Sequence, residues 1–278
     1  MYILATDLDR TLFPNGKHKY DNSMKIFKEI IKEKNIELIY ATGRRLKSVI
    51  HGIKKFKAPL PKYLITEIGT KVYYRIADKF IEDRNWIKEI KENTKKWNIN
   101  LFKKKLSNIP ILRLQEHYNQ NDFKLSYYVD DLDSFSQKNT RREIEKIIKS
   151  ICINATTIFS VNESKHYGYL DIMPECTTKL GALEYLRKKT NIKKKDFIYC
   201  GDSGNDLHPL IFGYKSILVR NATQRLKNIV RSKLHMHNLH KNVYFAEGYR
   251  NLNGYYVSGI IEGLIKHGII SSKFLTLS

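Results

Sequence analysis

The chain has 278 residues, and 42% of them are hydrophobic, which is enough for a buried core in one large domain or two smaller ones. The formal net charge is +22, a balance that can attract nucleic acid, an acidic membrane surface or an anionic substrate. The basic residues are spread along the whole chain without a nucleic-acid aromatic motif, so they favour a solvated surface over a nucleic-acid partner.

Three further features narrow the class of protein. No apolar run approaches the roughly 20 residues that a membrane-spanning helix needs, so we expect no membrane segment. The first residues lack the basic start and the small-residue cleavage site of a signal peptide, which favours a cytoplasmic protein. The three cysteines are far apart and form no C-x-x-C pair, so neither a disulfide framework nor a structural zinc site is predicted.

Strand-like and helical patterns alternate from the start of the chain. Short apolar runs predict buried strands, and apolar stripes at helical spacing predict amphipathic helices between them. The first two strands end directly before polar residues, Asp7 and Thr42. The predicted elements are, in order, a strand over residues 2–6, a helix over 22–31, a strand over 37–41, a helix from residue 46 and a strand over 63–66.

The middle of the chain has a different pattern, with two charged helices and several neighbouring strands. The helices are predicted over residues 86–97 and 140–150, and the strands over 111–114, 125–129 and 157–161. Such a set is typical of an α+β unit. We predict an inserted α+β domain over residues 80–168, between two parts of a main domain at 1–79 and 169–278.

The last part of the chain returns to the strand–helix alternation. Helices are predicted over residues 179–190 and 256–267, and strands over 197–200 and 216–219. Strands that alternate with helices indicate a parallel sheet covered on both faces. The predicted fold class is therefore α/β, a Rossmann-like parallel sheet with an inserted α+β domain.

Acidic residues follow the first predicted strand in the run Asp7-Leu8-Asp9-Arg10-Thr11. In an open parallel sheet the functional site lies outside the carboxyl ends of the strands. Two carboxylates two residues apart can share a substrate there: one attacks phosphorus while the other handles the proton of the leaving group. An Asx-type turn that happens to hold two aspartates remains the structural alternative.

A second acidic run, residues 201–206, follows the strand at 197–200 and supplies two carboxylates, Asp202 and Asp206, with the carboxamide of Asn205. So many oxygen donors in one turn suit Mg²⁺, which keeps several waters and binds substrate phosphate. The alternative is an ordinary polar turn before a helix.

Two other groups can hold phosphate. The hydroxyl of Thr42 and the backbone N–H of Gly43 follow a strand, where a plain strand-to-helix turn is the alternative. Lys179 opens a predicted helix and can neutralise charge on the transferring phosphoryl group, although most lysines are simply exposed.

Taken in chain order, at residues 7–11, 42–44, 179 and 201–206, the four clusters resemble the motifs of the haloacid dehalogenase (HAD) superfamily, and further segments look like sucrose-phosphate phosphatases. These segments are residues 67–70, 124–128, 170–174, 200–206, 221–222, 259–264 and 267–268. The resemblance implies a HAD-type core, an inserted cap that selects the leaving group, and hydrolysis of a small phosphorylated sugar with Mg²⁺ as cofactor.

The resemblance also implies residue roles. Asp7 would be the nucleophile and Asp9 the general acid/base. Asp7, the main-chain carbonyl of Asp9 and Asp202 would bind Mg²⁺, with Asp206 supporting them. Thr42, Gly43, Lys179 and Asn205 would hold the phosphate. The chain departs from the family pattern at three places: the family usually has a small or amide residue at position 10, a small or polar one at 45, and Lys-Gly where this chain has Lys179-Leu180-Gly181.

The identity of the sugar stays open at this level, because cap contacts set specificity. Candidate cap contacts are Lys124, Ser126, Lys165 and His166, for each of which an exposed polar residue is the alternative. Other functions also remain open: a phosphatase for an amino sugar or glycosyl phosphate, a phosphomutase, and a non-catalytic binder of nucleic acid or anions. The histidines of residues 235–240 could bind a transition metal, although a surface segment is favoured.

Overall fold

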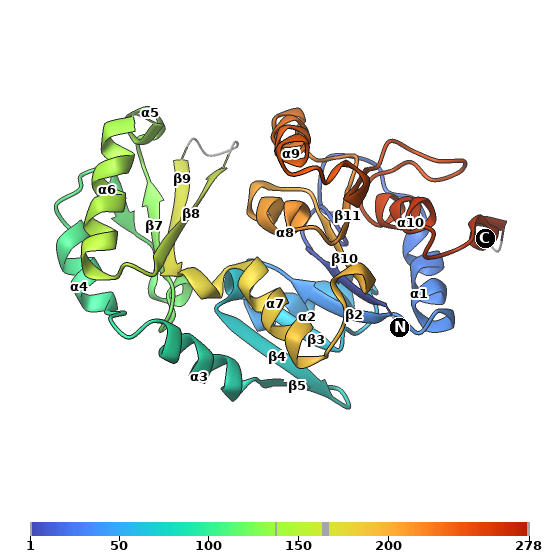
Figure 1. The fold of residues 1–278 in the computed structure, drawn as a ribbon, viewed down its shortest axis with the longest axis horizontal. Helices are drawn as coiled ribbons and strands as arrows, with labels where there is room; N and C mark the ends of the chain where they lie inside the picture. The colour runs from blue at the N-terminus through green and yellow to red at the C-terminus, as the bar shows by residue number, and fades with distance from the viewer. Residues whose placement is uncertain (1, 137, 163–166, 277–278) are drawn as a thin grey trace. The chain divides into compact units, whose positions relative to one another are not determined.

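A computed structural model describes residues 2–136, 138–162 and 167–276 of the chain. It divides into two compact units (Figure 1). The first comprises Met1–Asp83 and Ala182–Ser278, and the second comprises Arg84–Gly181. The boundary predicted between residues 168 and 169 lies inside a strand, β9 (Tyr167–Pro174), of the second unit.

The first unit is built on an eight-stranded sheet with the order β12-β11-β10-β1-β2-β3-β4-β5. The six strands from β12 to β3 are parallel, and β4 and β5 are added antiparallel at one edge. The strands are β1 (Ile3–Thr6), β2 (Glu37–Ala41), β3 (Tyr63–Thr66), β4 (Lys71–Ile76), β5 (Lys79–Glu82), β10 (Phe197–Gly201), β11 (Lys215–Leu218) and β12 (Val243–Phe245).

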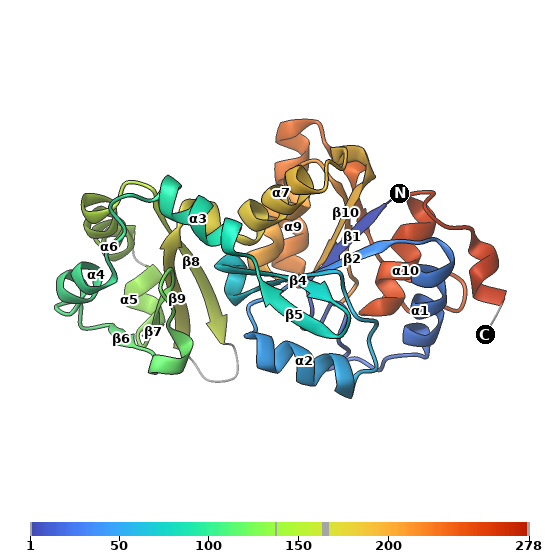
Figure 2. The same cartoon turned by 90° about the horizontal axis from the view of Figure 1, so that it is seen from below.

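Helices cover both faces of this sheet, which is why its central strands can be apolar throughout. The apolar stripes of α1, α2 and α10 share one core with alternate residues of β1, β2 and β10, among them Leu4, Leu38 and Ile198. Figure 2 shows α2 below the sheet and α7 and α9 above it. The helices are α1 (Ser23–Glu33), α2 (Leu46–Lys55), α7 (Lys179–Lys189), α8 (Leu207–Ile211), α9 (Gln224–His237) and α10 (Val257–Lys266).

The second unit contains a four-stranded antiparallel sheet with the order β6-β7-β9-β8. Side chains of α4 and α6, such as Phe102 and Ile144, pack with Leu125 and Leu170 of the sheet in a separate core. The elements are α3 (Arg84–Asn93), α4 (Ile99–Leu106), β6 (Leu112–Leu114), β7 (Leu125–Val129), α5 (Leu132–Ser136), α6 (Lys138–Ile151), β8 (Ala155–Asn162) and β9 (Tyr167–Pro174).

The α/β fold class predicted from the sequence is confirmed. The helix predicted over residues 86–97 was too long at its end, because α3 stops at Asn93 and a separate helix, α4, begins at Ile99 with Asn98 capping it through its side chain. The antiparallel strands β4 and β5 were not predicted. No helix among the described residues is both long and apolar enough to cross a membrane.

Candidate active site

The carboxyl ends of β1 and β10 bring the two acidic runs together. The parallel register places Thr6 opposite Cys200, and the N–H of Asp7 donates to the Cys200 carbonyl over 2.9 Å. Asp7 directly follows the end of β1, and Asp202 directly follows the end of the neighbouring strand β10. The convergence that the sequence predicts for these residues is present within the first unit.

Three buried carboxylates form one cluster at this sheet edge. Asp7, Asp202 and Asp206 each offer an oxygen, and these three oxygens lie within 4.8 Å of one another. Their side chains are almost inaccessible to solvent. Buried like charges at this spacing repel one another, so the cluster suits a divalent cation, which prefers carboxylate oxygens. Among the described His, Cys, Asp and Glu residues, no other group converges in this way.

Asp206 organises the turn that follows β10. One of its oxygens accepts from the N–H groups of Asp202 and Ser203, at 3.1 and 3.0 Å, and from the Ser203 hydroxyl. Its other oxygen accepts from the Tyr199 hydroxyl at 2.5 Å. A Cβ on Gly201 would lie only 2.6 Å from the Asp206 side chain, so this approach requires glycine. Asp206 therefore fixes the main chain that carries Asp202.

Asp9 is held by an arginine rather than by the acidic cluster. Arg44 donates to both carboxylate oxygens, from Nε at 2.7 Å and from Nη2 at 2.5 Å, and Asn15 donates at 2.6 Å. The hydrogen bond to Asp9 raises the pKa of the Arg44 guanidinium above its usual value. Because this geometry is bidentate, it fixes the orientation of the Asp9 carboxylate as well as its charge. Neither Asn15 nor this pairing was predicted from the sequence.

Arg10 lies beside Asp202, in a backbone conformation that arginine rarely adopts, with φ at 60°. Its Nε is 3.3 Å from one oxygen of Asp202, while the hydroxyl of Thr11 donates to the other oxygen at 3.3 Å. The side chain of Asn221 donates to the Arg10 carbonyl at 2.6 Å and accepts from the Tyr256 N–H. Asn221, which lies in one of the segments that resemble sucrose-phosphate phosphatases, thus supports the loop after β1 although it is distant in the sequence.

The residues predicted to hold phosphate occupy different settings. Thr42 follows β2, is almost fully buried, and accepts from the Arg44 N–H at 3.2 Å, whereas Gly43 beside it is exposed. Asn205 is half-buried and accepts from the Ser203 hydroxyl at 2.9 Å. Lys179 belongs to the second unit, opens α7 and is only 1% exposed. Their contact with phosphate stays a prediction.

The strained segment after β3 supports this end of β2. Glu67, Ile68 and Gly69 all have positive φ, and the N–H groups of the first two donate to the carbonyls of Arg44 and Thr42 at 3.0 Å. Positive φ is costly for branched side chains and persists where surrounding contacts enforce it. The segment therefore fixes the main chain of the Thr42–Arg44 turn.

Known proteins resemble this chain over nearly its whole length. Residues 1–268 match the family described as sucrose-6F-phosphate phosphohydrolase. The chain belongs to this family. The predicted resemblance to HAD-type phosphatases is thereby confirmed, and the protein is an enzyme of that kind.

Individual relatives agree with the family. A Nitrosococcus oceani protein named "Putative HAD-like hydrolase" is 33% identical over 264 residues, which cover 94% of this chain and 70% of that protein. Kanosamine-6-phosphate phosphatase of Bacillus subtilis is 28% identical over 265 residues, covering 90% of each. The structure of the sucrose-phosphatase of Synechocystis sp. PCC6803, determined with sucrose and phosphate, has the same fold with a TM-score of 0.74 at 21% identity, covering 96% of this chain and 98% of that one.

In this sucrose-6F-phosphate phosphohydrolase family member, two predicted cap residues form a buried polar cluster of the second unit. Ser126 is fully buried, and its hydroxyl donates to Asp171. The ammonium of Lys124, which is 8% exposed, lies 3.7 Å from the same carboxylate. Asp171 was not singled out as a cap contact from the sequence, although it pairs with Ser126 across β7 and β9. Lys165 and His166 lie outside the described residues.

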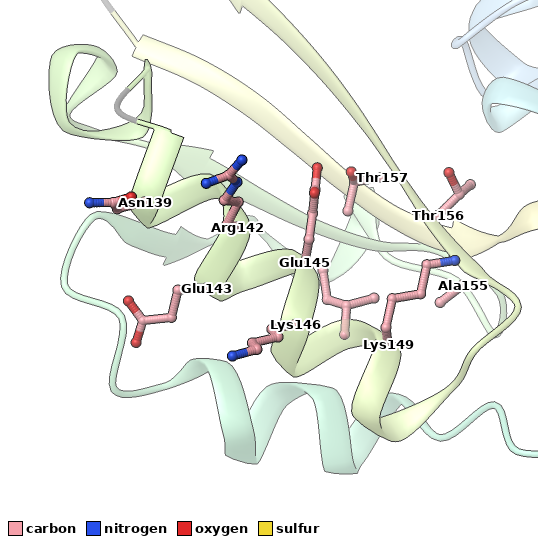
Figure 3. A pocket seen from close by; sticks show the side chains of 10 residues that line it. Asn139, Arg142, Glu143, Glu145, Lys146, Lys149, Ala155, Thr156 and Thr157 are labelled. Atoms are coloured by element: carbon pink, nitrogen blue, oxygen red, sulfur yellow. The ribbon is translucent and has the colours of Figure 1, made fainter.

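Two other features lie apart from the acidic cluster: a groove of the second unit and the histidines of residues 235–240, which the sequence analysis considered as transition-metal ligands. A groove of about 700 Å³ lies between α6 and the edge strand β8, where Arg142 and Lys149 alternate with Glu145 (Figure 3). The rings of His235 and His240 lie 5.3 Å apart at the end of α9, but they belong to no converging metal-ligand group among the described residues.

Proposed function

We propose that this protein hydrolyses the phosphomonoester of a small sugar phosphate, with Mg²⁺ as cofactor and a transient phosphoaspartate on Asp7. The observation that supports it most strongly is the buried cluster of Asp7, Asp202 and Asp206 at the carboxyl ends of β1 and β10. A bound Mg²⁺ would offset the charge of nucleophile and phosphate there. Asp7 and Asp202, with the Asp9 carbonyl, would hold it, and Asp206 would support them.

In the first step a carboxylate oxygen of Asp7 attacks phosphorus, and the bond from phosphorus to the sugar oxygen breaks. Asp9 gives its proton to that oxygen, so the sugar leaves as a neutral alcohol. In the second step Asp9 takes a proton from water, the resulting hydroxide attacks the phosphoaspartate, and inorganic phosphate leaves. Thr42, Gly43, Asn205 and Lys179 would bind the phosphate oxygens, since phosphoryl transfer depends mainly on positioning and charge stabilisation.

The pairing of Asp9 with Arg44 bears on this mechanism. Arg44 stabilises the ionised carboxylate, which is the form that accepts a proton from water in the second step. For the first step Asp9 must hold a proton, so its contact with Arg44 has to weaken when substrate is present. The 40% exposure of the Asp9 side chain leaves it accessible for that change.

The test is Asp7→Asn, assayed by release of inorganic phosphate with a panel of sugar phosphates. The panel contains sucrose 6-phosphate, hexose 6-phosphates, an amino sugar 6-phosphate and a glycosyl phosphate. We expect wild-type activity that requires Mg²⁺ and no turnover by Asp7→Asn. Asp78→Asn, the same change in an exposed turn between β4 and β5, is the matched control and should retain activity. Turnover by Asp7→Asn at the wild-type rate would refute the assignment.

The same panel decides between the remaining alternatives. The similarity to a kanosamine-6-phosphate phosphatase favours an amino sugar phosphate as the second candidate substrate. A phosphomutase would convert one sugar phosphate into an isomer without releasing phosphate. A non-catalytic binder would release none and would bind nucleic acid with an affinity that falls steeply with salt.

A further inference from the structure

Arg10 places a positive charge against a carboxylate that the proposed Mg²⁺ site requires. Its Nε lies 3.3 Å from Oδ2 of Asp202, whose side chain is only 2% exposed. The N–H is not aligned on that oxygen as a hydrogen bond, so the contact is coulombic. The other oxygen of Asp202 accepts from Thr11. The guanidinium of Arg10 and the hydroxyl of Thr11 therefore lie at the two oxygens of Asp202, and a cation that binds this carboxylate must compete with them.

The loop holds the guanidinium in this place. Nη2 of Arg10 donates to the Asn221 carbonyl at 3.4 Å, and the Asn221 side chain donates back to the Arg10 carbonyl. The Arg10 N–H donates to Asn15 at 2.7 Å. These contacts keep the residue at a φ of 60°, a conformation that asparagine, aspartate and glycine adopt far more readily. Backbone strain beside reacting groups is a reason to look for a role of the side chain.

We propose that Arg10 is an internal competitor for the metal: its guanidinium neutralises Asp202 in the metal-free protein and lowers the affinity of the acidic cluster for Mg²⁺. The inference rests on the proposed Mg²⁺ site. A divalent cation at the cluster is repelled by the nearby guanidinium and must displace it from Oδ2 of Asp202. Because the Arg10 side chain is 48% exposed, it can move into solvent without breaking a buried hydrogen bond of Asp202.

The test is the dissociation constant of Mg²⁺, measured by titration calorimetry with MgCl₂ alone at fixed ionic strength. We expect Arg10→Asn to bind Mg²⁺ about tenfold more tightly than wild type, equivalent to about 1.4 kcal/mol. Asparagine suits the left-handed backbone, and Arg10→Gly is a second variant with the same advantage. The Mg²⁺-induced rise in melting temperature should be larger in both variants.

Arg250→Asn is the matched control. Arg250 is also exposed and left-handed, with φ at 55°, and its guanidinium lies over the Tyr249 ring rather than beside a described carboxylate of the cluster. The Arg250→Asn variant should bind Mg²⁺ with the same affinity as wild type. If wild type, Arg10→Asn and Arg10→Gly have equal dissociation constants for Mg²⁺, the proposed role of Arg10 is overturned. This holds even if the two variants have a higher KM for substrate. Absence of Mg²⁺ binding in every protein would overturn the metal site as well, and phosphate release measured separately tests the proposed function.

Discussion

Asp206 offers a direct test of how the turn after β10 is held. We consider Asp206→Ala, Asp206→Asn and Tyr199→Phe. The alanine variant removes the acceptor of the Tyr199 hydroxyl and of the Asp202 and Ser203 N–H groups, in a place where Asp206 is fully buried. A buried donor left without an acceptor costs about 1–3 kcal/mol, and such losses within one network are not additive.

For Asp206→Ala we expect a loss of about 3 kcal/mol in the free energy of unfolding, because several buried donors lose their acceptor and their losses are not additive. Asp206→Asn can keep an oxygen toward the two N–H groups and turn its amide toward Tyr199, so a loss of about 1–2 kcal/mol is expected. Tyr199→Phe removes one hydroxyl donor and should cost about 1 kcal/mol. If the network holds the turn, the loss in the free energy of unfolding should be largest for Asp206→Ala, smaller for Asp206→Asn and smallest for Tyr199→Phe.

The assay is urea unfolding followed by far-UV circular dichroism, with the free energy taken from linear extrapolation. Both tryptophans, Trp86 and Trp97, lie in the second unit, so their fluorescence reports that unit separately. The Asp206 variants should change the circular dichroism transition. If Asp206→Ala unfolds within about 0.5 kcal/mol of wild type, the reasoning about Asp206 is wrong, since surface substitutions lie in that range.

Two other predictions concern the arginine pair and the pH. Arg44→Lys loses the two parallel hydrogen bonds to Asp9, so we expect kcat for a sugar phosphate to fall on the order of 10- to 100-fold. The melting temperature should be unchanged, because a part-exposed ion pair stabilises the fold little. An unaltered kcat would contradict this prediction. Burial lowers the pKa of His267, so the unfolded chain binds that proton more tightly and the free energy of unfolding should fall as the pH drops below about 6.5. His267→Gln should weaken this pH dependence in urea unfolding, and an identical dependence would disprove it.

The sequence was sufficient to predict that Asp7 and Asp202 converge. Each follows a short apolar run, and parallel strands end at a common sheet edge, so no tertiary detail was needed. The antiparallel pair β4 and β5 was not predicted, although Val72, Tyr73 and Tyr74 of β4 are residue types that are common in strands.

Other parts of the site could not be predicted from the sequence. The pairing of Asp9 with Arg44 depends on loop conformation, and the loop from residue 7 to residue 22 has no hydrophobic period that would fix it. The full burial of Ser126 also depends on the register of β7 against β9, which no local pattern specifies. For Asn15 the sequence indicates a turn, since the residue follows Pro14 and precedes Gly16, but it does not indicate the contact with Asp9.

The two arginines of the site differ in how they hold their carboxylates, and the difference separates their roles. Arg44 makes a hydrogen-bonded fork to Asp9 and donates further to Ser48, so it fixes an orientation. Arg10 approaches one oxygen of Asp202 without hydrogen-bond alignment and keeps half of its side chain in solvent. A directed contact suits a group that must present a proton at a defined place, and an undirected one suits a counter-ion that exchanges with a metal. Part of the excess positive charge of the chain is therefore used to balance carboxylates that would otherwise repel one another at the end of β1.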